Sequence, residues 1–373
     1  LVTAIEACWL MGATVMVLPI PPRMPSIDAF VATCRRTMSR GDADALLIDA
    51  ELAAFIGAPR PVPVVLTLAE LDDRAGTIEA PWEPGFGEVE RDAILQFTSG
   101  STSEPKGVRV GYDLLESNST DIAARLALDP DHDVAVSWLP LYHDMGLVGL
   151  LATAMSQSTP LVLASPRDFM ARPAMWFETL ARHRATVTAG PNFAYALAAR
   201  SLKQRDDPLD LSSLRVAING AEPVRPDTMR ALIDAGAAHG LDPGCVLPAY
   251  GLAECGIAGC FPPPGRGLTT EWVDADTLAP GGRAVVVDER PTAREQVLCG
   301  TTVPGVEARI VDVDTRERLP ARHVGELMLS GRGVSAGYHS NPEADAQRFH
   351  DGWLETGDLA YLTDAGEAVI CGR

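Results

Sequence analysis

One short stretch of the chain combines hydroxyl groups, glycines and a lysine. It reads Thr98-Ser99-Gly100-Ser101-Thr102-Ser103-Glu104-Pro105-Lys106-Gly107 and follows an apolar run that predicts a strand over Ala93–Phe97. Small hydroxyl and glycine residues leave backbone N–H groups open to an anion, and a lysine neutralises phosphate charge. The order is not that of a P-loop, because glycine follows Lys106. The stretch predicts either a polyphosphate loop or a plain surface turn.

A second group of reactive side chains follows the predicted strand Val134–Trp138. Pro140 ends that strand, and His143 stands just beyond its carboxyl end, where loops carry function. A purely structural interpretation is also available, because Asp144 is a suitable cap for a helix that begins near Gly146. A third segment, Thr188–Tyr195, again runs from a strand end into a helix, and core packing explains its aromatic residues equally well.

Three later segments place small, aromatic or acidic residues after apolar strands. At Gly220 and Ala221 a flat base could lie against the backbone, although close strand–helix packing would select the same small residues. Tyr250 offers an aromatic face, and Glu254 offers a carboxylate oxygen of the kind that Mg²⁺ prefers. Asp358 follows a tight Thr-Gly turn, where it is either a turn residue or a ligand for a diol.

Composition restricts the class of protein. The 373 residues are 46% apolar, enough for two or three packed units, and the net charge of −19 argues against a nucleic-acid surface. The cysteines are odd in number and form no Cys-x-x-Cys pair, which predicts reduced thiols in a cytoplasmic protein. The histidines lack zinc-ligand spacing. Leu1–Ile20 is apolar, but Glu6 and Gly12 interrupt it, so we expect a buried helix and a buried strand rather than a membrane segment.

From Leu1 to Phe261, apolar runs of strand length alternate with amphipathic runs of helix length, which predicts mostly parallel sheets covered on both faces. The predicted strands are Thr14–Leu18, Ala45–Ile48, Val64–Leu68, Ala93–Phe97, Val134–Trp138, Pro160–Ala164, Ala185–Ala189, Leu214–Asn219 and Val246–Tyr250. The predicted helices include Ser26–Met38, Leu114–Leu126, Gly146–Met155, Pro173–Arg184, Ala194–Leu202 and Pro226–Ala235. In such sheets ligands bind at the carboxyl ends of the strands.

After Phe261 the pattern changes. Gly267–Gly300 has weak periodicity, and the remainder predicts antiparallel hairpins that form a small barrel or half-barrel. Their expected strands are Ala308–Val313, Gly325–Ser330, Asp358–Leu362 and Ala368–Cys371. The predicted fold is therefore α/β, with two doubly wound, mostly parallel αβ subdomains in residues 1–261 and a small antiparallel β-barrel-like subdomain in residues 262–373.

Six motifs, from Thr98 to Arg373, resemble in order those of the adenylate-forming enzymes, and the wording Gly190-Pro191-Asn192-Phe193-Ala194-Tyr195 is most similar to fatty acyl-AMP ligases. The resemblance implies ATP and Mg²⁺ as cofactors, with His143, Glu254 and Lys106 as catalytic residues and Glu254 as the metal ligand. The implied nucleotide contacts are Thr98, Ser99, Gly100, Ser101, Thr102, Lys106, Gly220, Ala221, Glu222, Tyr250, Gly251, Asp358 and Arg373. The implied acyl contacts are Trp138, His143, Met145, Gly149, Asn192 and Phe193.

The resemblance also implies parts outside this sequence. The family continues beyond its Gly-Arg pair, here Gly372-Arg373, into a mobile C-terminal domain that carries a catalytic lysine, so we expect residues to be missing after Arg373. The chain also starts at Leu1 without a methionine and already inside a core element, so we expect residues to be missing upstream. Fatty acyl-AMP ligases carry an insertion in the smaller subdomain. We expect Gly267–Gly300 to be either this insertion or a plain long loop.

The implied function is ATP-dependent conversion of a long-chain fatty acid into acyl-AMP and pyrophosphate. The acyl group would then pass to the phosphopantetheine arm of an acyl carrier protein in lipid or polyketide synthesis. Two alternatives stay open: a fatty acyl-CoA synthetase of the same fold, and a non-catalytic module that binds acyl adenylate. An amino-acid-activating domain is disfavoured, because the expected Asp is replaced by Asn192-Phe193-Ala194.

Overall fold

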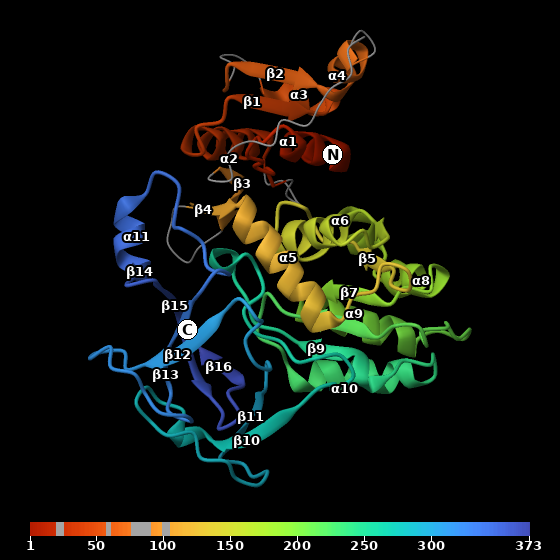
Figure 1. Cartoon of the computed structure of the whole chain (residues 1–373). Coiled ribbons are helices and arrows are strands. Elements are labelled where there is room, and N and C mark those ends of the chain that lie inside the picture. Colours follow the sequence, from red (N-terminus) through yellow and green to blue (C-terminus); the bar gives the residue numbers. More distant parts are fainter. Residues whose placement is uncertain (20–25, 57–60, 76–90, 99–104) are drawn as a thin grey trace. The chain divides into compact units, whose positions relative to one another are not determined.

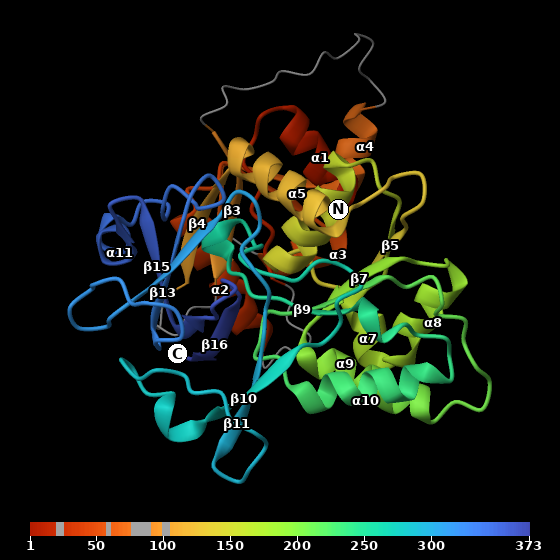
Figure 2. The ribbon, with the colours of Figure 1, turned by 60° about the horizontal axis from the view of Figure 1, so that its bottom comes forward.

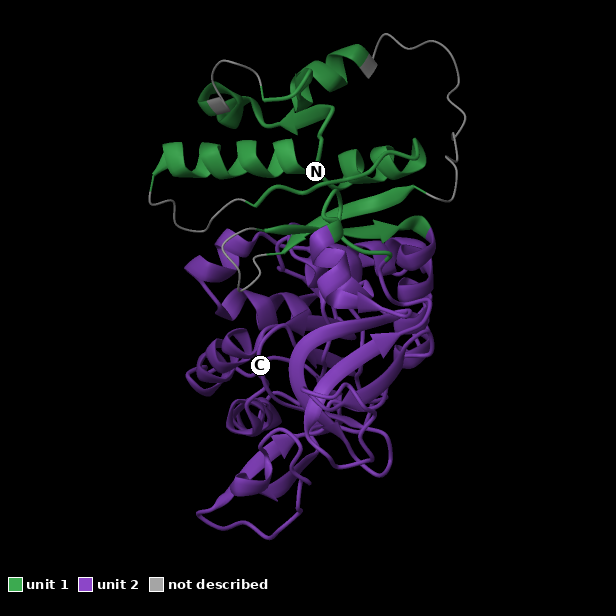
Figure 3. Ribbon diagram, turned by 90° about the vertical axis from the view of Figure 1, so that its left-hand side faces the viewer, with its two compact units in different colours: residues 1–112, 336–342 green, residues 113–335, 343–373 purple. Residues whose placement is uncertain are grey.

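The computed structural model describes residues 1–19, 26–56, 61–75, 91–98 and 105–373, and Figure 1 and Figure 2 draw the chain in two orientations. The chain forms two compact units, shown in Figure 3. Unit 1 contains residues 1–112 and 336–342, and unit 2 contains residues 113–335 and 343–373. The predicted subdomain boundary at residue 261 falls inside unit 2 and stays a prediction.

Unit 1 contains two small sheets and several helices. Strands β1 (Ala45–Ile48) and β2 (Val64–Thr67) pair in parallel, whereas β3 (Asp92–Thr98) and β4 (Lys106–Gly111) pair antiparallel. Val108 of β4 also bridges Tyr338. The helices are α1 (Val2–Leu10), α2 (Ile27–Arg40), α3 (Ala50–Ile56) and α4 (Leu68–Ala75).

Two predictions for the N-terminal segment are wrong. In the predicted strand Thr14–Leu18, Val15 alone pairs, through one parallel bridge to Ile94 of β3. A strand needs ladder hydrogen bonds along its length, and β3 supplies them to this single residue. The predicted buried helix exists as α1, but Ile5 is its only buried residue and Leu1 is 65% exposed. The apolar composition of this segment predicts that a helix forms, but it does not show which other residues pack on that helix.

Unit 2 is built on a five-stranded parallel sheet in the order β6-β5-β7-β8-β9. The strands are β5 (Ala135–Ser137), β6 (Leu161–Leu163), β7 (Val187–Gly190), β8 (Val216–Asn219) and β9 (Val246–Pro248), each shorter at one or both ends than predicted. The helices near this sheet are α5 (Tyr112–Leu126), α6 (Thr153–Ser156), α7 (Pro166–Ala171), α8 (Ala174–Arg182), α9 (Asn192–Lys203) and α10 (Pro226–Ala237).

Side chains from this sheet enter two different cores. Val136, Ala217 and Val246 pack into a cluster with residues of α8, α9 and α10. Their neighbours in sequence belong to a second cluster, which includes α5 and residues from the C-terminal part of unit 2. This alternation follows the two-residue period of a strand, and Figure 2 shows α5 and helices α9 and α10 on opposite sides of β7 and β9. The sheet is therefore covered on both faces, as predicted.

The C-terminal part of unit 2 is rich in antiparallel strands. Strands β12 (Glu307–Val311), β13 (Gly325–Ser330), β14 (Phe349–His350), β15 (Trp353–Leu362) and β16 (Ala368–Gly372) form one curled sheet. Gly267–Gly300 contains a separate antiparallel pair, β10 (Thr270–Asp274) and β11 (Ala293–Val297). Whether this stretch is the family insertion stays a prediction. Helix α11 (Pro342–Arg348) was not predicted, because its seven residues are too few for a periodic signal.

The amino ends of two sheet strands are tied together by a charged pair. Asp133, just before β5, is 3% exposed and accepts hydrogen bonds from Arg215 Nε at 2.7 Å and from the Thr186 hydroxyl at 2.6 Å. Arg215 also donates to the Leu126 carbonyl. Burial alone would raise the pKa of Asp133, but these hydrogen bonds outweigh it and lower that pKa.

We expect Arg215→Ala to lower the free energy of unfolding at neutral pH by about 3 kcal/mol or more, because it leaves Asp133 as a buried carboxylate without its cation. The lowered pKa of Asp133 means that the pair stabilises the fold above about pH 4 and that this contribution is lost as the pH falls further. Urea unfolding at pH 7 and at pH 3 would measure both effects. Arg184→Ala, which breaks the exposed pair with Asp210, should cost less than about 1 kcal/mol. Equal losses from the two variants would contradict the assignment.

Candidate active site

The predicted phosphate loop belongs to unit 1, where its two ends meet. Thr98 ends β3 and Lys106 begins β4, and the two residues are direct partners in the antiparallel ladder. The Lys106 ammonium lies 5.0 Å from the centroid of the Tyr338 ring, a cation–π contact. Ser99, Gly100, Ser101 and Thr102 lie outside the described residues. Thr98 and Lys106 therefore lie side by side at one end of the β3–β4 pair, and the phosphate-binding role of this stretch stays a prediction.

In unit 2, the loop after β5 holds a charged pair. His143 Nδ1 lies 2.6 Å from Asp144 Oδ1, and the Asp144 carboxylate also accepts from the Met145 N–H at 2.7 Å. Burial alone would lower the pKa of His143, but the hydrogen bond and negative charge of Asp144 outweigh it, so this pKa lies above its ordinary value. The sequence predicts only a capping role for Asp144. Its position next to His143 was the signal that could have revealed the pair.

Trp138 lies inside a buried aromatic cluster rather than in the loop. Its ring stacks on Phe169 with centroids 3.6 Å apart, and Trp176 packs edge-on against it at 5.7 Å. Phe193 reaches the same cluster through Phe169 at 6.5 Å, although Phe193 is 45% exposed. Trp138 and Phe193, both predicted to contact an acyl chain, therefore belong to one aromatic group.

The segment after His143 is a π-helix, Met145–Ala152, followed by one turn of α-helix, α6, where sequence analysis predicted one helix over Gly146–Met155. A π-helix is rare and often marks a functional site. Gly146 lies against the loop before it: a Cβ there would overlap the Pro140 carbonyl oxygen. At Gly149 a Cβ would meet nothing closer than 3.9 Å. Close packing against the Pro140 carbonyl therefore requires glycine at position 146, whereas there is room for a side-chain methyl group at Gly149.

The loops after β7 and β8 are joined by polar contacts. Glu222 Oε1 accepts a hydrogen bond from the Phe193 N–H at 2.6 Å, at the start of α9. Asn192 is buried, and its Oδ1 accepts from Asn219 Nδ2 at 3.2 Å and from the Arg225 N–H at 3.0 Å. Asn192 thus holds these loops together, and Glu222 links the predicted adenine wall to the predicted acyl segment. Neither contact was predicted.

The loops after β8 and β9 lie close together through small residues. A Cβ on Gly220 would lie 3.2 Å from the Ala249 carbonyl oxygen, and one on Gly251 would overlap the Ile257 carbonyl oxygen. Ala221 has a φ of 67°, in the left-handed region. These features let backbone approach backbone at the edge where Tyr250 lies, which suits a site for a flat ring but serves loop packing equally.

Tyr250 and Asp358, separated by 108 positions in sequence, are brought together by the fold. The Tyr250 hydroxyl donates to Asp358 Oδ2 at 2.8 Å. Burial, followed by the negative charge of Asp358, raises the pKa of Tyr250. Arg373 Nε lies 3.4 Å from Asp358 Oδ1, so three predicted nucleotide contacts form one group.

Glu254 lies in a short 3-10 helix, Ala253–Cys255, in the same loop as Tyr250. It is 9% exposed, and its backbone carbonyl accepts from the Ser335 N–H at 2.8 Å. Among the described residues, no group of three His, Cys, Asp or Glu side chains could hold a metal ion. A single carboxylate is nevertheless the donor chemistry expected where Mg²⁺ is held mainly by substrate phosphates and water.

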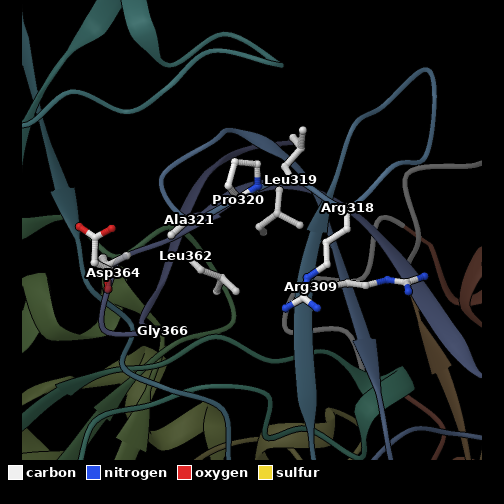
Figure 4. A pocket seen from close by; sticks show the side chains of 10 residues that line it. Arg309, Arg318, Leu319, Pro320, Ala321, Leu362, Asp364 and Gly366 are labelled. Atoms are coloured by element: carbon white, nitrogen blue, oxygen red, sulfur yellow. The ribbon is translucent and has the colours of Figure 1, made fainter.

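A cavity of about 200 Å³ lies at the β15–β16 turn, away from these residues. Figure 4 shows Arg318 on one side of it and Asp364 on the other, with Leu319, Pro320 and Leu362 between them. None of the predicted site residues lines this cavity, and it is smaller than typical ligand pockets. It is therefore not the candidate site.

The candidate residues of unit 2 share one edge of the parallel sheet. Strands β5, β7, β8 and β9 are neighbours and parallel, so the loops that carry His143, Asn192, Gly220 and Tyr250 all leave at the same edge. Ligands of doubly covered α/β sheets bind at this edge. The fold and the arrangement of these residues define an α/β ligand-binding enzyme architecture.

Comparison with known proteins identifies the family. The model for the AMP-binding enzyme family matches residues 1–339, and the chain belongs to this family. A putative ligase of Mycobacterium tuberculosis, Rv1013, is 38% identical over 373 residues, which cover 99% of this chain and 67% of the relative. The long-chain-fatty-acid–AMP ligase FadD26 of Mycobacterium marinum is 33% identical over 85% of this chain and 56% of the relative.

Solved structures agree. A fatty acyl-adenylate ligase from L. pneumophila, in complex with acyl adenylate and pyrophosphate, superposes with a TM-score of 0.90 at 28% identity, covering 100% of this chain and 65% of that chain. The predicted family and fold class are therefore confirmed. The chain spans about two thirds of that structure's length, and between 56% and 67% of the two relatives.

We expect Gly146→Ala to lower the free energy of unfolding by about 1–3 kcal/mol, because the new methyl group must displace the Pro140 carbonyl. Gly149→Ala is the matched control in the same helix and should change stability by less than about 1 kcal/mol, because there is room for the methyl group. Urea unfolding of both variants measures the difference. A similar loss of stability in both variants would show that the close approach of Gly146 to the Pro140 carbonyl is not the cause of the loss.

We expect Asp144→Asn to lower the pKa of His143, because it removes the negative charge and leaves the effect of burial. The raised pKa means that the pair stabilises the folded protein below about pH 6.5, and that this contribution is lost as the pH rises through the folded value. NMR titration of the His143 ring measures the change. Asp168→Asn, at an exposed position on α7, should leave the titration unchanged, and an unchanged curve in Asp144→Asn would contradict the pairing.

Proposed function

We propose that this protein activates a long-chain fatty acid with ATP, forming acyl-AMP and releasing pyrophosphate. The observation that carries the proposal is the Tyr250–Asp358 hydrogen bond beside the glycine-lined loops of the AMP-binding family sheet. It presents an aromatic ring and a carboxylate together, as an adenosine requires. Names of relatives and neighbours support the choice of acid: a long-chain-fatty-acid–AMP ligase and a fatty acyl-adenylate ligase.

Each proposed nucleotide contact has its own part of the ligand. Tyr250, with Gly220, Ala221, Glu222 and Gly251, would form the adenine site. Asp358 and Arg373 would contact the ribose. The β- and γ-phosphates would be bound by Thr98, Ser99, Gly100, Ser101 and Thr102, and Lys106 would neutralise their charge. Mg²⁺, where bound to Glu254 and the phosphates, would supply further positive charge.

The fatty acid would lie along the segments after β5 and β7. His143 would face the acid carboxylate, and the raised pKa of His143 favours a cation that attracts it. Trp138, Met145, Gly149, Asn192 and Phe193 would line the path of the chain, with Trp138 and Phe193 supplying aromatic surface. An apolar wall with one cation at its end suits a long-chain carboxylate.

The reaction itself needs no covalent enzyme intermediate. A carboxylate oxygen attacks the α-phosphorus of ATP, the new O–P bond forms, and the bond between the α-phosphorus and the bridging oxygen breaks. Pyrophosphate carries away the electron pair. The residues would act by positioning the two anions in line and by neutralising their charge.

We further propose that the acyl group passes to an acyl carrier protein. The support is the fatty-acid–AMP ligase name of a relative, which specifies AMP rather than CoA. The experiment is a comparison of acceptors with the full-length protein, long-chain acid and ATP. Acyl transfer to a phosphopantetheinylated carrier protein with little acyl-CoA is expected, whereas robust acyl-CoA formation would favour a fatty acyl-CoA synthetase. Binding of acyl adenylate without turnover would indicate a non-catalytic module.

We expect Lys106→Ala to lower kcat/KM for ATP by about tenfold or more, because it removes a positive charge beside the phosphates. Pyrophosphate exchange dependent on a long-chain fatty acid, measured with the full-length protein, tests this. Lys203→Ala, at the exposed end of α9, is the control and should exchange at the wild-type rate. Unchanged exchange in Lys106→Ala would remove Lys106 from the site.

A further inference from the structure

Strand β15 bulges at the residues that lead to the candidate ribose ligand. In its pairing with β13, Glu326 faces Leu359 and Met328 faces Glu355. Leu327 alone therefore faces the three residues Thr356–Asp358. A bulge leaves backbone groups without ladder partners and re-aims a side chain, and such bulges are common next to active sites. The direction of the Asp358 side chain thus depends on what satisfies the bulge.

A carboxylate from the neighbouring strand supplies the missing partner. Glu326 Oε1 accepts a hydrogen bond from the Gly357 N–H at 3.0 Å. The other oxygen of Glu326 accepts from Arg316 Nη1 at 2.6 Å, and Arg316 also pairs with Glu355. Glu326 is therefore fixed between the bulge and a guanidinium, and it is only 16% exposed at its side chain.

The peptides on either side of Gly357 are held by other groups. The Thr356 hydroxyl donates to the Leu327 carbonyl at 2.7 Å and accepts from the Asp358 N–H at 3.1 Å. Arg348 Nη2 donates to the Thr356 carbonyl at 2.8 Å. Gly357 itself has a φ of 74° and no side chain to restrict it, so its conformation is the least restrained by local sterics. The Thr356–Gly357 peptide is therefore held at both of its polar groups, by Arg348 at the carbonyl and by Glu326 at the N–H.

We propose that Glu326, held by Arg316, is a positioning residue that aims the Asp358 carboxylate at the vicinal hydroxyls of a bound ribose. The inference rests on the proposed role of Asp358 in nucleotide binding. The Tyr250 hydroxyl already donates to one oxygen of Asp358 at 2.8 Å, whereas Arg373 Nε lies at a longer 3.4 Å from the other oxygen. Glu326 therefore fixes the direction of this second oxygen toward the ribose hydroxyls.

The test compares two nucleotides that differ only in the hydroxyls concerned. Binding of AMP and of 2′,3′-dideoxy-AMP to the chain is measured by calorimetry. We expect the wild-type protein to bind AMP at least tenfold more tightly, because hydrogen bonds to a charged group are lost with the hydroxyls. In Glu326→Ala, affinity for AMP should fall about tenfold while that for dideoxy-AMP stays within twofold, so that the preference disappears.

Variants with graded chemistry sharpen the result. Glu326→Gln keeps an oxygen that can accept from Gly357 and should retain AMP affinity within about threefold of wild type. Glu317→Ala, at an exposed position in the turn that carries Arg316, should bind both nucleotides as the wild type does. Dideoxy-AMP serves as an internal control for folding, because a variant that still binds it has an intact adenine and phosphate site.

Two results would overturn the inference in different ways. If Asp358→Ala abolishes the preference for AMP and Glu326→Ala retains it, Asp358 contacts the ribose without the help of Glu326. A Glu326→Ala variant that loses both nucleotides equally would likewise show a general structural role and not positioning. If the wild-type protein itself shows no preference, the ribose role of Asp358 is wrong, and the proposed function loses that contact together with the inference.

Discussion

Burial of the parallel sheet on both faces is the constraint on which the rest of unit 2 depends. Side chains of β5, β8 and β9 alternate between one core shared with α8, α9 and α10 and another shared with α5 and the antiparallel strands, and β7 contributes to both cores. After each strand, the connecting segment must therefore bring the chain back to the end of the sheet where the strands begin. All of these strands then end at the opposite edge of the sheet. The loops with His143, Asn192, Gly220 and Tyr250 leave at that edge because each follows the carboxyl end of a strand in one parallel sheet.

The two ends of the sheet have different tasks. At the amino ends, Asp133 and Arg215 join β5 to β8 through a buried ion pair that needs no ligand. At the carboxyl ends, contacts between loops replace such a pair: Glu222 accepts from the Phe193 N–H, and Asn192 joins Asn219 and Arg225. These contacts hold loops in which Gly220 and Gly251 let backbone pack closely on backbone.

The second core also explains how a distant strand reaches this edge. Residues of β12, β13 and β15 pack against the face of the parallel sheet that α5 covers, which places Asp358 beside Tyr250. The bulge in β15 then sets the direction of the Asp358 side chain.

Among the described residues, no helix is both long and apolar enough to cross a membrane. The cytoplasmic location, the carrier-protein partner and the individual roles of the site residues remain predictions.

The sequence by itself determined the family, the α/β class and the order of the site motifs, because strand and helix periodicities and short motifs are local properties of the chain. It also located β1 and most strands of the central sheet to within a few residues. Only the tertiary structure decided that Val15 forms a single bridge, that α1 is exposed, that Asp144 pairs with His143 and that Glu326 supports the bulge before Asp358. Each depends on a partner across space, which periodicity along one chain cannot specify.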